Sequence, residues 1–158
     1  MPGRFAGLAH KGRLLAPFVF LAGVLFASNS PAACRPPGPV EQGTVAGHYD
    51  GDTLRLADDR RVRLLGIDTP EMNYRKGTPQ PLAQCALQRT RSLLPQGGPV
   101  RLARDRQARD RYGRQLAHAY RPDGVNVEET LLREGRAVSF ILPPNVALAD
   151  CLLPAARQ

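Results

Sequence analysis

Alternating hydrophobic and polar residues mark several short stretches of the chain, and this period of two predicts β-strands. Three such stretches, 44–49, 53–56 and 62–64, follow one another closely. An Asp-Gly turn signal separates the first two, and a polar tip at 57–61 separates the second from the third. Neighbouring strands joined by short turns pair as hairpins, so we expect a three-stranded antiparallel meander.

The rest of the chain mixes strands with helices. Asn126 and Glu129 suit the N-cap and capping partner of one helix, which Gly135 ends. Helices are predicted over 82–94, 126–134 and 143–152 and strands over 100–103 and 116–120, with a brief apolar stretch at 137–142. Several short strands with three interspersed helices predict an α+β domain built on a small barrel.

The first 32 residues predict a secretory signal peptide. Three basic residues precede an apolar run at 14–27, which is too short for a comfortable membrane span. Small residues at Ser30 and Ala32 suit cleavage after Ala32. The mature chain is then expected to be secreted or periplasmic and to have no stable association with a membrane.

Two other ways of processing this end stay open. Cleavage after Ala33 is a near alternative. Attachment of a lipid at Cys34 is another, although Pro31 stands where such a signal has leucine. In either case the prolines within 33–44 predict an extended lead-in, and 45–158 is expected to form one domain, with a monomer as the default state.

The chain carries a formal net charge of +8, and loss of Arg4, Lys11 and Arg13 with the signal peptide lowers it to +5. A basic surface attracts a polyanion such as nucleic acid, although a basic balance by itself is equally typical of a solvated surface.

Three cysteines remain after cleavage, in a compartment that favours disulfides. Cys34 and Cys151 flank the domain, and the ends of a domain commonly lie near each other, so we predict a disulfide between them. Cys85 falls in a predicted helix, where we expect it to be a small buried hydrophobic residue.

Acidic residues gather at the two ends of the predicted hairpin. Asp50 and Asp52 precede its first strand, and Asp68 and Glu71 follow its second. Converging carboxylates repel one another unless a cation or a proton relieves the charge. With Arg63 nearby, such a site could hold a divalent ion, activate water and neutralise charge on a phosphate, which together suit phosphodiester hydrolysis.

Three segments considered together resemble the thermonuclease (micrococcal nuclease) family. They are Asp-Gly-Asp-Thr at 50–53, the stretch 63–71 and Asp-Arg-Tyr-Gly-Arg at 110–114, in that order and at similar spacing. Each segment alone is also typical of an ordinary turn. The resemblance covers about 45–151 and implies an OB-fold with a five-stranded β-barrel and three helices.

The resemblance also implies a calcium site. Asp52 and Asp68 match the residues whose carboxylates bind the ion, and Thr69 matches the one that binds it through its backbone carbonyl. Asp50 matches a supporting acidic position. Calcium suits such ligands because it accepts carboxylate, carbonyl and water oxygens in irregular geometry.

Catalytic roles follow from the same resemblance. Glu71 matches the general base that activates water, and Arg63 and Arg114 match the two guanidinium groups that grip the phosphate. Tyr112 matches an aromatic residue that lies against the nucleotide, and Asp110 is expected to set the loop that bears it. The implied activity is calcium-dependent cleavage of DNA and RNA, single-stranded or frayed, with little sequence specificity.

Two departures from the family pattern stand out. Phe140 and Leu142 occupy positions where the family often has tyrosines, and the last helix is shorter than usual. Two alternative functions stay open: a non-catalytic OB-fold module that binds nucleic acid, and a periplasmic protein that binds another anion. The set of carboxylates argues against both, since acidic groups repel an anion in the absence of a metal.

Overall fold

The computed structural model describes residues 3, 34–75 and 77–157. The predicted signal peptide lies, apart from Gly3, outside the described residues, as do both of its candidate cleavage sites. Among the described residues, no helix combines the length and the hydropathy needed to cross a membrane.

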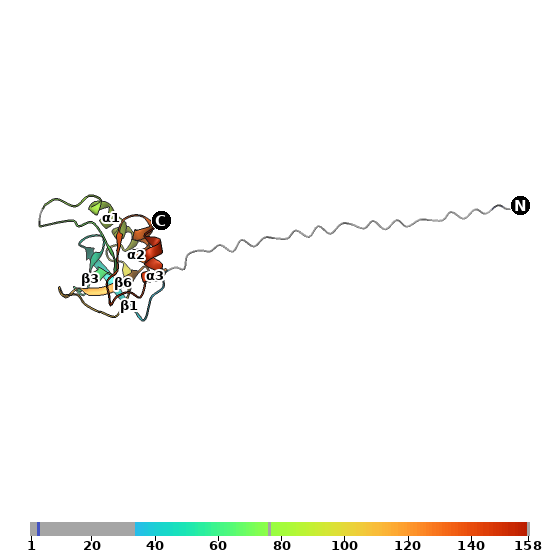
Figure 1. Cartoon of the computed structure of the whole chain (residues 1–158), viewed down its shortest axis with the longest axis horizontal. Coiled ribbons are helices and arrows are strands. Elements are labelled where there is room, and N and C mark those ends of the chain that lie inside the picture. Colours follow the sequence, from blue (N-terminus) through green and yellow to red (C-terminus); the bar gives the residue numbers. More distant parts are fainter. Residues whose placement is uncertain (1–2, 4–33, 76, 158) are drawn as a thin grey trace.

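Five strands close into a barrel in the order β1-β2-β3-β6-β5. Figure 1 labels β1, β3 and β6 of this barrel. All neighbours pair antiparallel except β3 and β6, which run parallel and close the barrel. The strands are β1 Val40–His48, β2 Thr53–Leu56, β3 Arg61–Leu64, β5 Pro99–Ala103 and β6 Gln115–Tyr120. With three helices around it, this barrel confirms the predicted α+β class and the five-stranded OB-fold.

The first strand begins at Val40, four residues before the predicted start. Residues 40–44 pair with β5, and residues 45–48 pair with β2, with an irregularity in the register between Val45 and Gly47. The extended lead-in is therefore shorter than predicted, because residues 40–43 belong to β1. The prolines of this segment end at Pro39, and the β5 partner that orders the residues beyond it lies about 60 positions downstream.

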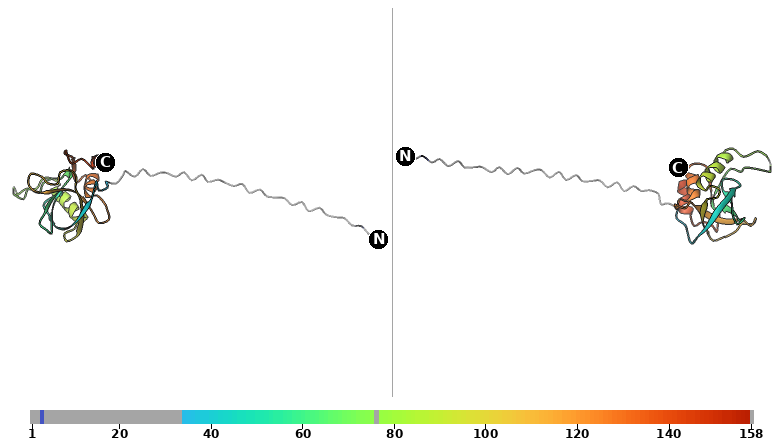
Figure 2. Two further views of the ribbon diagram at one scale, coloured as in Figure 1. Left: turned by 90° about the horizontal axis from the view of Figure 1, so that it is seen from below. Right: turned by 180° about the vertical axis from the view of Figure 1, so that it is seen from behind.

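Three helices pack around the barrel: α1 Ala83–Leu93, α2 Val127–Arg133 and α3 Ala149–Ala155 (Figure 2). At the start of α2 the side chain of Asn126 accepts a hydrogen bond from the Glu129 amide at 2.7 Å, which confirms the predicted N-cap. The Glu129 carboxylate bonds to the Cys34 amide at 3.0 Å and to Arg133, so it serves long-range contacts as well as its own helix.

A two-stranded ribbon of β4 Gly66–Asp68 and β7 Val138–Phe140 lies beside the barrel. Gly66 pairs with Phe140 and Asp68 with Val138. Ile67, between them, is buried and belongs to the hydrophobic core, whereas all three residues of β7 are exposed. The ribbon therefore joins the core on one side and presents β7 to solvent on the other.

The predicted disulfide is present between Cys34 and Cys151, whose Cα atoms lie 5.5 Å apart. It ties the segment before β1 to α3. The prediction for Cys85 is wrong, because this thiol is exposed. Ala83, Ala86 and other residues on the opposite side of α1 face the barrel, and Cys85 lies on the solvent side.

Polar side chains are also buried near the junction of β6 and α2. Glu128 is fully buried, and its Oε1 accepts a hydrogen bond from the Ala119 amide at 2.8 Å. Burial raises the pKa of Glu128 to about 8, with the Ala119 hydrogen bond acting in the other direction. Burial lowers the pKa of His118 to about 4, so the 3.8 Å contact between the two side chains joins neutral groups near pH 7.

We expect the disulfide to stabilise the domain. Changing Cys151 to serine should lower the free energy of unfolding by about 2–5 kcal/mol, because the unfolded chain regains the freedom of a long loop. Urea denaturation of the oxidised protein and of the variant measures the difference. Cys85→Ser is the matched control and should stay within about 0.5 kcal/mol, since its side chain is exposed. Equal losses in the two variants would contradict a stabilising role for the crosslink.

Glu128 should make stability fall as pH rises from 6.5 to 8. The folded protein keeps a proton on Glu128 that the unfolded chain has already lost above its ordinary pKa of 4.5, so unfolding releases a proton in this range. His118 and His48, whose pKa values are lowered to about 4, make stability rise with pH, but this effect ends near their ordinary pKa of 6.5. The expected decrease is on the order of 1–2 kcal/mol.

Urea denaturation at several pH values measures this decrease, and Glu128→Gln should remove it while keeping the acceptor for Ala119. Glu134→Gln, at the exposed end of the same helix, should leave the decrease in place. A decrease that persists in Glu128→Gln would contradict the assignment.

Candidate active site

The Arg63 side chain connects the acidic residues at the two ends of the β2–β3 hairpin. One guanidinium nitrogen lies 3.1 Å from Asp52 Oδ2, and the other lies 2.8 Å from Asp68 Oδ1. The first nitrogen also donates to the carbonyls of Leu64 and Ile67, at 3.0 and 2.9 Å. These contacts fix a side chain that is only 13% exposed. The guanidinium is therefore held in place by the turn from β3 to β4 and by both carboxylates.

Asp52 is buried where β2 begins. Its Oδ2 accepts hydrogen bonds from the amide and the hydroxyl of Thr69, at 2.7 and 2.9 Å, and its Oδ1 accepts one from the Thr53 hydroxyl. Burial raises the pKa of Asp52 to about 6; Arg63 and the Thr69 hydrogen bonds oppose this shift, and the charge of Asp50 adds to it. A positive ion near Asp52 would stabilise its charged form.

The Asp-Gly-Asp turn at 50–52 packs closely against Thr69 and helix α1. A side chain at Gly51 would lie 2.9 Å from the methyl group of Thr69 and 3.0 Å from Ala86 of α1, so only glycine fits. The Thr90 hydroxyl of α1 also donates to the Gly51 carbonyl at 2.7 Å. The first helix thus fixes the turn that carries Asp50 and Asp52.

Asp50 and Glu71 complete the acidic end of the site. Asp50 accepts a hydrogen bond from the Asp52 amide at 3.3 Å, and its pKa is raised by burial and also by the charge of Glu71. Glu71 is exposed, and its backbone is fixed by hydrogen bonds to Gln80 at 2.8 and 3.0 Å. The electrostatic coupling of Asp50 to Glu71 places both carboxylates in one acidic region.

Oxygen donors dominate this region, which is the chemistry that a hard cation such as calcium prefers. The Thr69 carbonyl accepts no hydrogen bond from any described residue. Two carboxylates with a free carbonyl match the predicted ligand set, and burial together with the charge of Asp50 raises the pKa of Asp52, a shift that a bound cation would oppose. Within the described ranges, however, no group of three or more His, Cys, Asp or Glu side chains is arranged to hold a metal.

A second loop, between β5 and β6, brings Arg114 to the site. Asp110 Oδ1 accepts hydrogen bonds from the amides of Tyr112 and Arg114, both at 2.9 Å, and Oδ2 accepts one from Arg114 Nε at 2.6 Å. Although partial burial raises the pKa of Asp110, the hydrogen bonds and charge of Arg114 lower it overall. Asp110 therefore shapes the turn and also orients Arg114.

Tyr112 is 59% exposed on this turn. The guanidinium carbons of Arg111 and Arg114 lie 4.8 and 5.6 Å from the centre of its ring, and the Arg111 side chain donates to its hydroxyl. Contacts with two cations keep one aromatic side chain at the surface beside Arg114.

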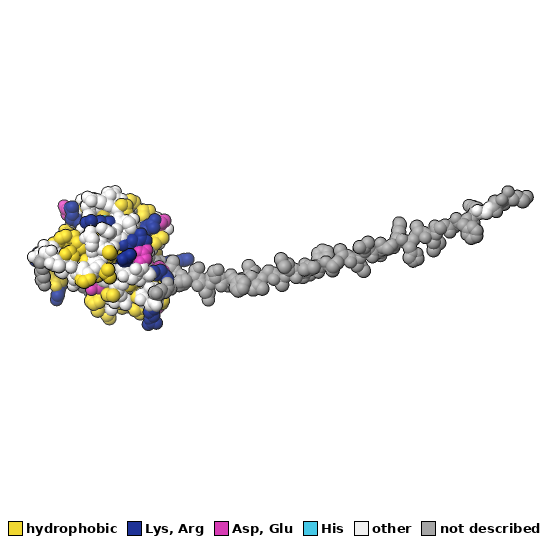
Figure 3. Space-filling view, turned by 90° about the horizontal axis from the view of Figure 1, so that it is seen from above, with side chains coloured by type: hydrophobic (Ala, Val, Ile, Leu, Met, Phe, Trp, Pro, Cys, Tyr) yellow, Lys and Arg dark blue, Asp and Glu magenta, His cyan; other side chains and the backbone are white. Residues whose placement is uncertain are grey.

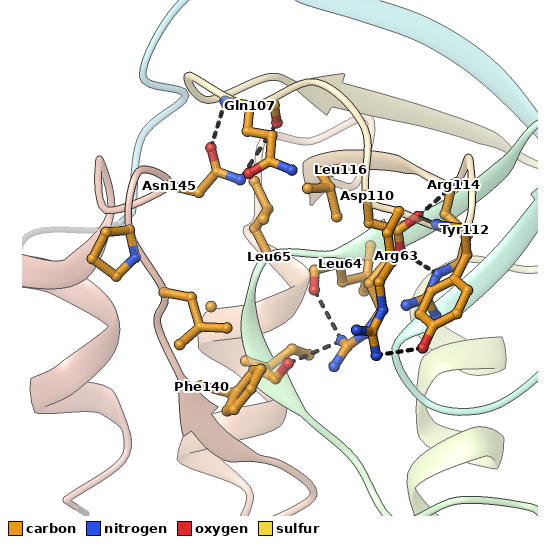
Figure 4. Close-up of a pocket in the computed structure, with 15 residues that line it drawn as sticks. Arg63, Leu64, Leu65, Gln107, Asp110, Tyr112, Arg114, Leu116, Phe140 and Asn145 are labelled. Carbon is orange, nitrogen blue, oxygen red and sulfur yellow. Dashed lines mark hydrogen bonds and ion pairs between the residues drawn. The ribbon is translucent and has the colours of Figure 1, made fainter.

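Arg63, Asp110, Tyr112 and Arg114 line one pocket of about 450 Å³, which we call pocket A (Figure 4). In this view Arg63 lies between Tyr112 and Phe140. Asp68 and Thr69 line a neighbouring pocket of about 290 Å³, which we call pocket B. Six predicted site residues thus line one of these two pockets, whereas Asp50, Asp52 and Glu71 line neither of them.

Sequence reasoning missed one pair that shapes pocket A. The Gln107 amide donates to Asn145 Oδ1 at 2.8 Å, and the Asn145 side chain donates back to the Gln107 carbonyl at 3.4 Å. The pair ties the β5–β6 loop to the segment before α3 and lines the pocket. Neither residue belongs to a local motif, so only the approach of distant segments could reveal the pair.

The Asp110 contacts predict a measurable stabilisation of the turn. Asp110→Ala should lower the free energy of unfolding by about 1–2 kcal/mol, because it leaves two amides and the Arg114 guanidinium without their acceptor. Thermal denaturation measures the loss, and the matched control is Asp123→Ala, which removes a similar turn contact and the Arg121 ion pair at a more exposed position. An equal or larger loss in the control would contradict this prediction.

Comparison with known proteins agrees with this geometry. The family model described as staphylococcal nuclease homologue matches residues 61–158, which include Arg63, Glu71 and Arg114 but not Asp50 or Asp52. The chain is 39% identical over 112 residues to endonuclease YncB of Bacillus subtilis, covering 68% of this chain and 52% of that protein.

Two further relatives show the same pattern. Thermonuclease of Staphylococcus intermedius is 42% identical over 101 residues, which cover 61% of this chain and 58% of that protein. The prophage-derived endonuclease YokF of Bacillus subtilis is 40% identical over 112 residues, covering 68% of this chain and 37% of that protein. The chain spans between about a third and three fifths of the length of these relatives. The match to the family model and the closed barrel show that the chain belongs to the staphylococcal nuclease homologue family.

Proposed function

We propose that the chain is a calcium-dependent nuclease that hydrolyses phosphodiester bonds in DNA and RNA with low sequence specificity. The observation that carries the proposal is the arrangement around Arg63, which contacts Asp52 and Asp68 and shares a pocket with Arg114. Two guanidinium groups beside a set of carboxylates suit a phosphate ester, because they can offset charge on both the substrate and the metal ligands. The names of three relatives, two endonucleases and a thermonuclease, are consistent with this activity.

Arg63 and Arg114 would grip the phosphate that is cleaved. Both line pocket A, Arg63 from β3 and Arg114 from the loop between β5 and β6, so one phosphate in this pocket would receive donors from two segments of the chain. Each guanidinium offers several donors in a fixed plane and can stabilise the negative charge that grows on the phosphate oxygens. The Asp110 contacts hold Arg114 ready for this role.

Asp52, Asp68 and the Thr69 carbonyl would hold calcium. When bound, the ion would polarise a phosphate oxygen and lower the pKa of a water molecule. Release of Arg63 from one or both carboxylates would free it for the phosphate. Asp50 would add negative charge beside Asp52, which adds to the rise that burial causes in the pKa of Asp52 and strengthens the attraction of the site for a cation.

Glu71 would act as the general base. It lies three residues beyond Asp68, its side chain is exposed, and its charge is felt by Asp50 in the same acidic region. A carboxylate in this position can take a proton from water that attacks the phosphorus. Tyr112, exposed beside Arg114, would lie against a base or sugar.

Low sequence specificity follows from the kind of contact on offer. Arginine contacts to phosphate and an aromatic contact to a ring do not distinguish one base from another. A single-stranded or frayed substrate suits pocket A, because a base must leave its stack to reach Tyr112. The expected partners are therefore DNA and RNA in these forms.

The proposed setting is the periplasm or the outside of the cell, where the chain would act as a monomer. The Cys34–Cys151 disulfide supports an oxidising compartment. The apolar run near the start of the sequence supports export through a signal peptide.

Hydrolysis of heat-denatured DNA tests the proposal. The mature chain should cut this DNA with calcium and stop when a chelator is added. Glu71→Gln should lower kcat by about 10²–10⁴-fold, because the variant lacks the general base. The matched control, Glu134→Gln at the end of α2, should cut normally.

Other results would each point elsewhere. A folded chain that binds DNA without cutting it would support the non-catalytic binding module. Cutting that continues in the chelator would contradict calcium dependence while leaving the nuclease proposal in place. Unchanged kcat in Glu71→Gln would remove Glu71 from the role of base.

A further inference from the structure

Pockets A and B lie at the two ends of the β4–β7 ribbon. Gly66 and Ile67 line pocket A, and Asp68, the next residue of β4, lines pocket B. On β7, Phe140 lines pocket A and Val138 lines pocket B. These two residues pair with Gly66 and Asp68. The ribbon thus runs from one pocket to the other, and the proposed metal ligand Asp68 lies at its pocket B end.

The apolar side chains of β7 are unusually open to solvent. Val138 is 66% exposed and Phe140 is 49% exposed, although they are large and hydrophobic. Alternate residues of a strand point to the same face and are roughly 6.7 Å apart. One strand therefore presents one apolar side chain to each pocket.

Leu82 gives pocket B a second exposed apolar wall. This side chain is 64% exposed, and its backbone has a φ of +66°, a conformation that side chains of L-residues rarely adopt. Strained residues of this kind cluster at binding sites, where the strain is retained because the position serves a function. Here the strained position lines the pocket, directly before α1.

Arg136 adds a positive charge to pocket B. The side chain is exposed. Arg89 holds the carboxylate of the nearby Glu134 at 2.6 and 2.7 Å and lowers its pKa, and the charge of Arg136 helps to lower it. An exposed guanidinium near two apolar walls is a combination that can bind a nucleotide, with its phosphate on the cation and its base or sugar on the walls.

We propose that pocket B is a second nucleotide subsite, which takes the residue on the other side of the phosphodiester bond from the nucleotide in pocket A. Leu82 and Val138 contact its base or sugar, and Arg136 contacts its phosphate. This inference rests on the proposed nuclease function. The substrate strand then runs along the ribbon, with the phosphate to be cleaved near Arg63 and Asp68.

A dinucleotide is then the shortest ligand that can occupy both pockets. A mononucleotide fills one pocket, and a dinucleotide fills both. Affinity should therefore rise with the second nucleotide and depend on Leu82 and Val138 only for the longer ligand.

Calorimetric titration measures this difference. The protein is Glu71→Gln with calcium, which should bind but not cut, and the ligands are thymidine 5′-monophosphate and its 5′-phosphorylated dinucleotide. We expect the dinucleotide to bind about 10-fold more tightly. Val138→Ser added to this protein should remove most of the 10-fold gain and leave the affinity for the mononucleotide unchanged.

Leu82→Gly is a second variant, and it removes the side chain while suiting the positive φ. It should have the same effect as Val138→Ser. Val125→Ser is the matched control: Val125 is 41% exposed on a turn outside both pockets, and its loss should leave both affinities unchanged.

Equal affinity for the two ligands would overturn the proposal, and so would a gain that survives in both Val138→Ser and Leu82→Gly. Failure of the proposed function is a separate result, since it would be seen as lack of cutting by the protein that carries Glu71. A protein that cuts DNA but shows no dinucleotide gain would keep its function and lose the second subsite.

Discussion

The contact of Arg63 with two carboxylates is the interaction on which the site depends. Asp52 is buried at the start of β2 and Asp68 is half-exposed in β4, so one guanidinium links a desolvated charge to an accessible one. Burial makes the charge of Asp52 costly, which the raised pKa expresses, and the Arg63 and Thr69 contacts offset part of that cost. The region stays rich in negative charge, and this excess is what would favour a cation.

Closure of the barrel determines where the second guanidinium group of the site, that of Arg114, lies. β3 and β6 pair in parallel, with Arg63 opposite Leu116, so the loop that ends at Arg114 reaches the side of the barrel that carries Arg63. Asp110 then holds Arg114 in place. Charged side chains of both signs are mixed elsewhere on the surface (Figure 3), which is typical of a solvated face. The site differs because its charges are fixed by packing and by one another.

Helix α1, the disulfide and the ribbon support the site from outside the barrel. The first helix packs beneath the Asp-Gly-Asp turn through Ala86 and Thr90. The disulfide links Cys151, in the first turn of α3, to Cys34 in the segment before β1, where the barrel begins. The ribbon carries Asp68 and the exposed apolar residues of β7. Each support joins residues far apart in sequence, so the acidic turn alone would not hold the arrangement.

The sequence by itself determined the local elements and the residue types of the site. Period-two alternation, turn residues and the Asn126 cap fixed most strands and α2, because these signals act between near neighbours. The resemblance identified the residues around Arg63. Only the tertiary structure decided that Val40 begins β1, that Cys85 is exposed and that Gln107 meets Asn145. It also decided that Arg63 contacts both carboxylates. These features depend on which distant segments pair and pack, and local pattern carries little information about such contacts.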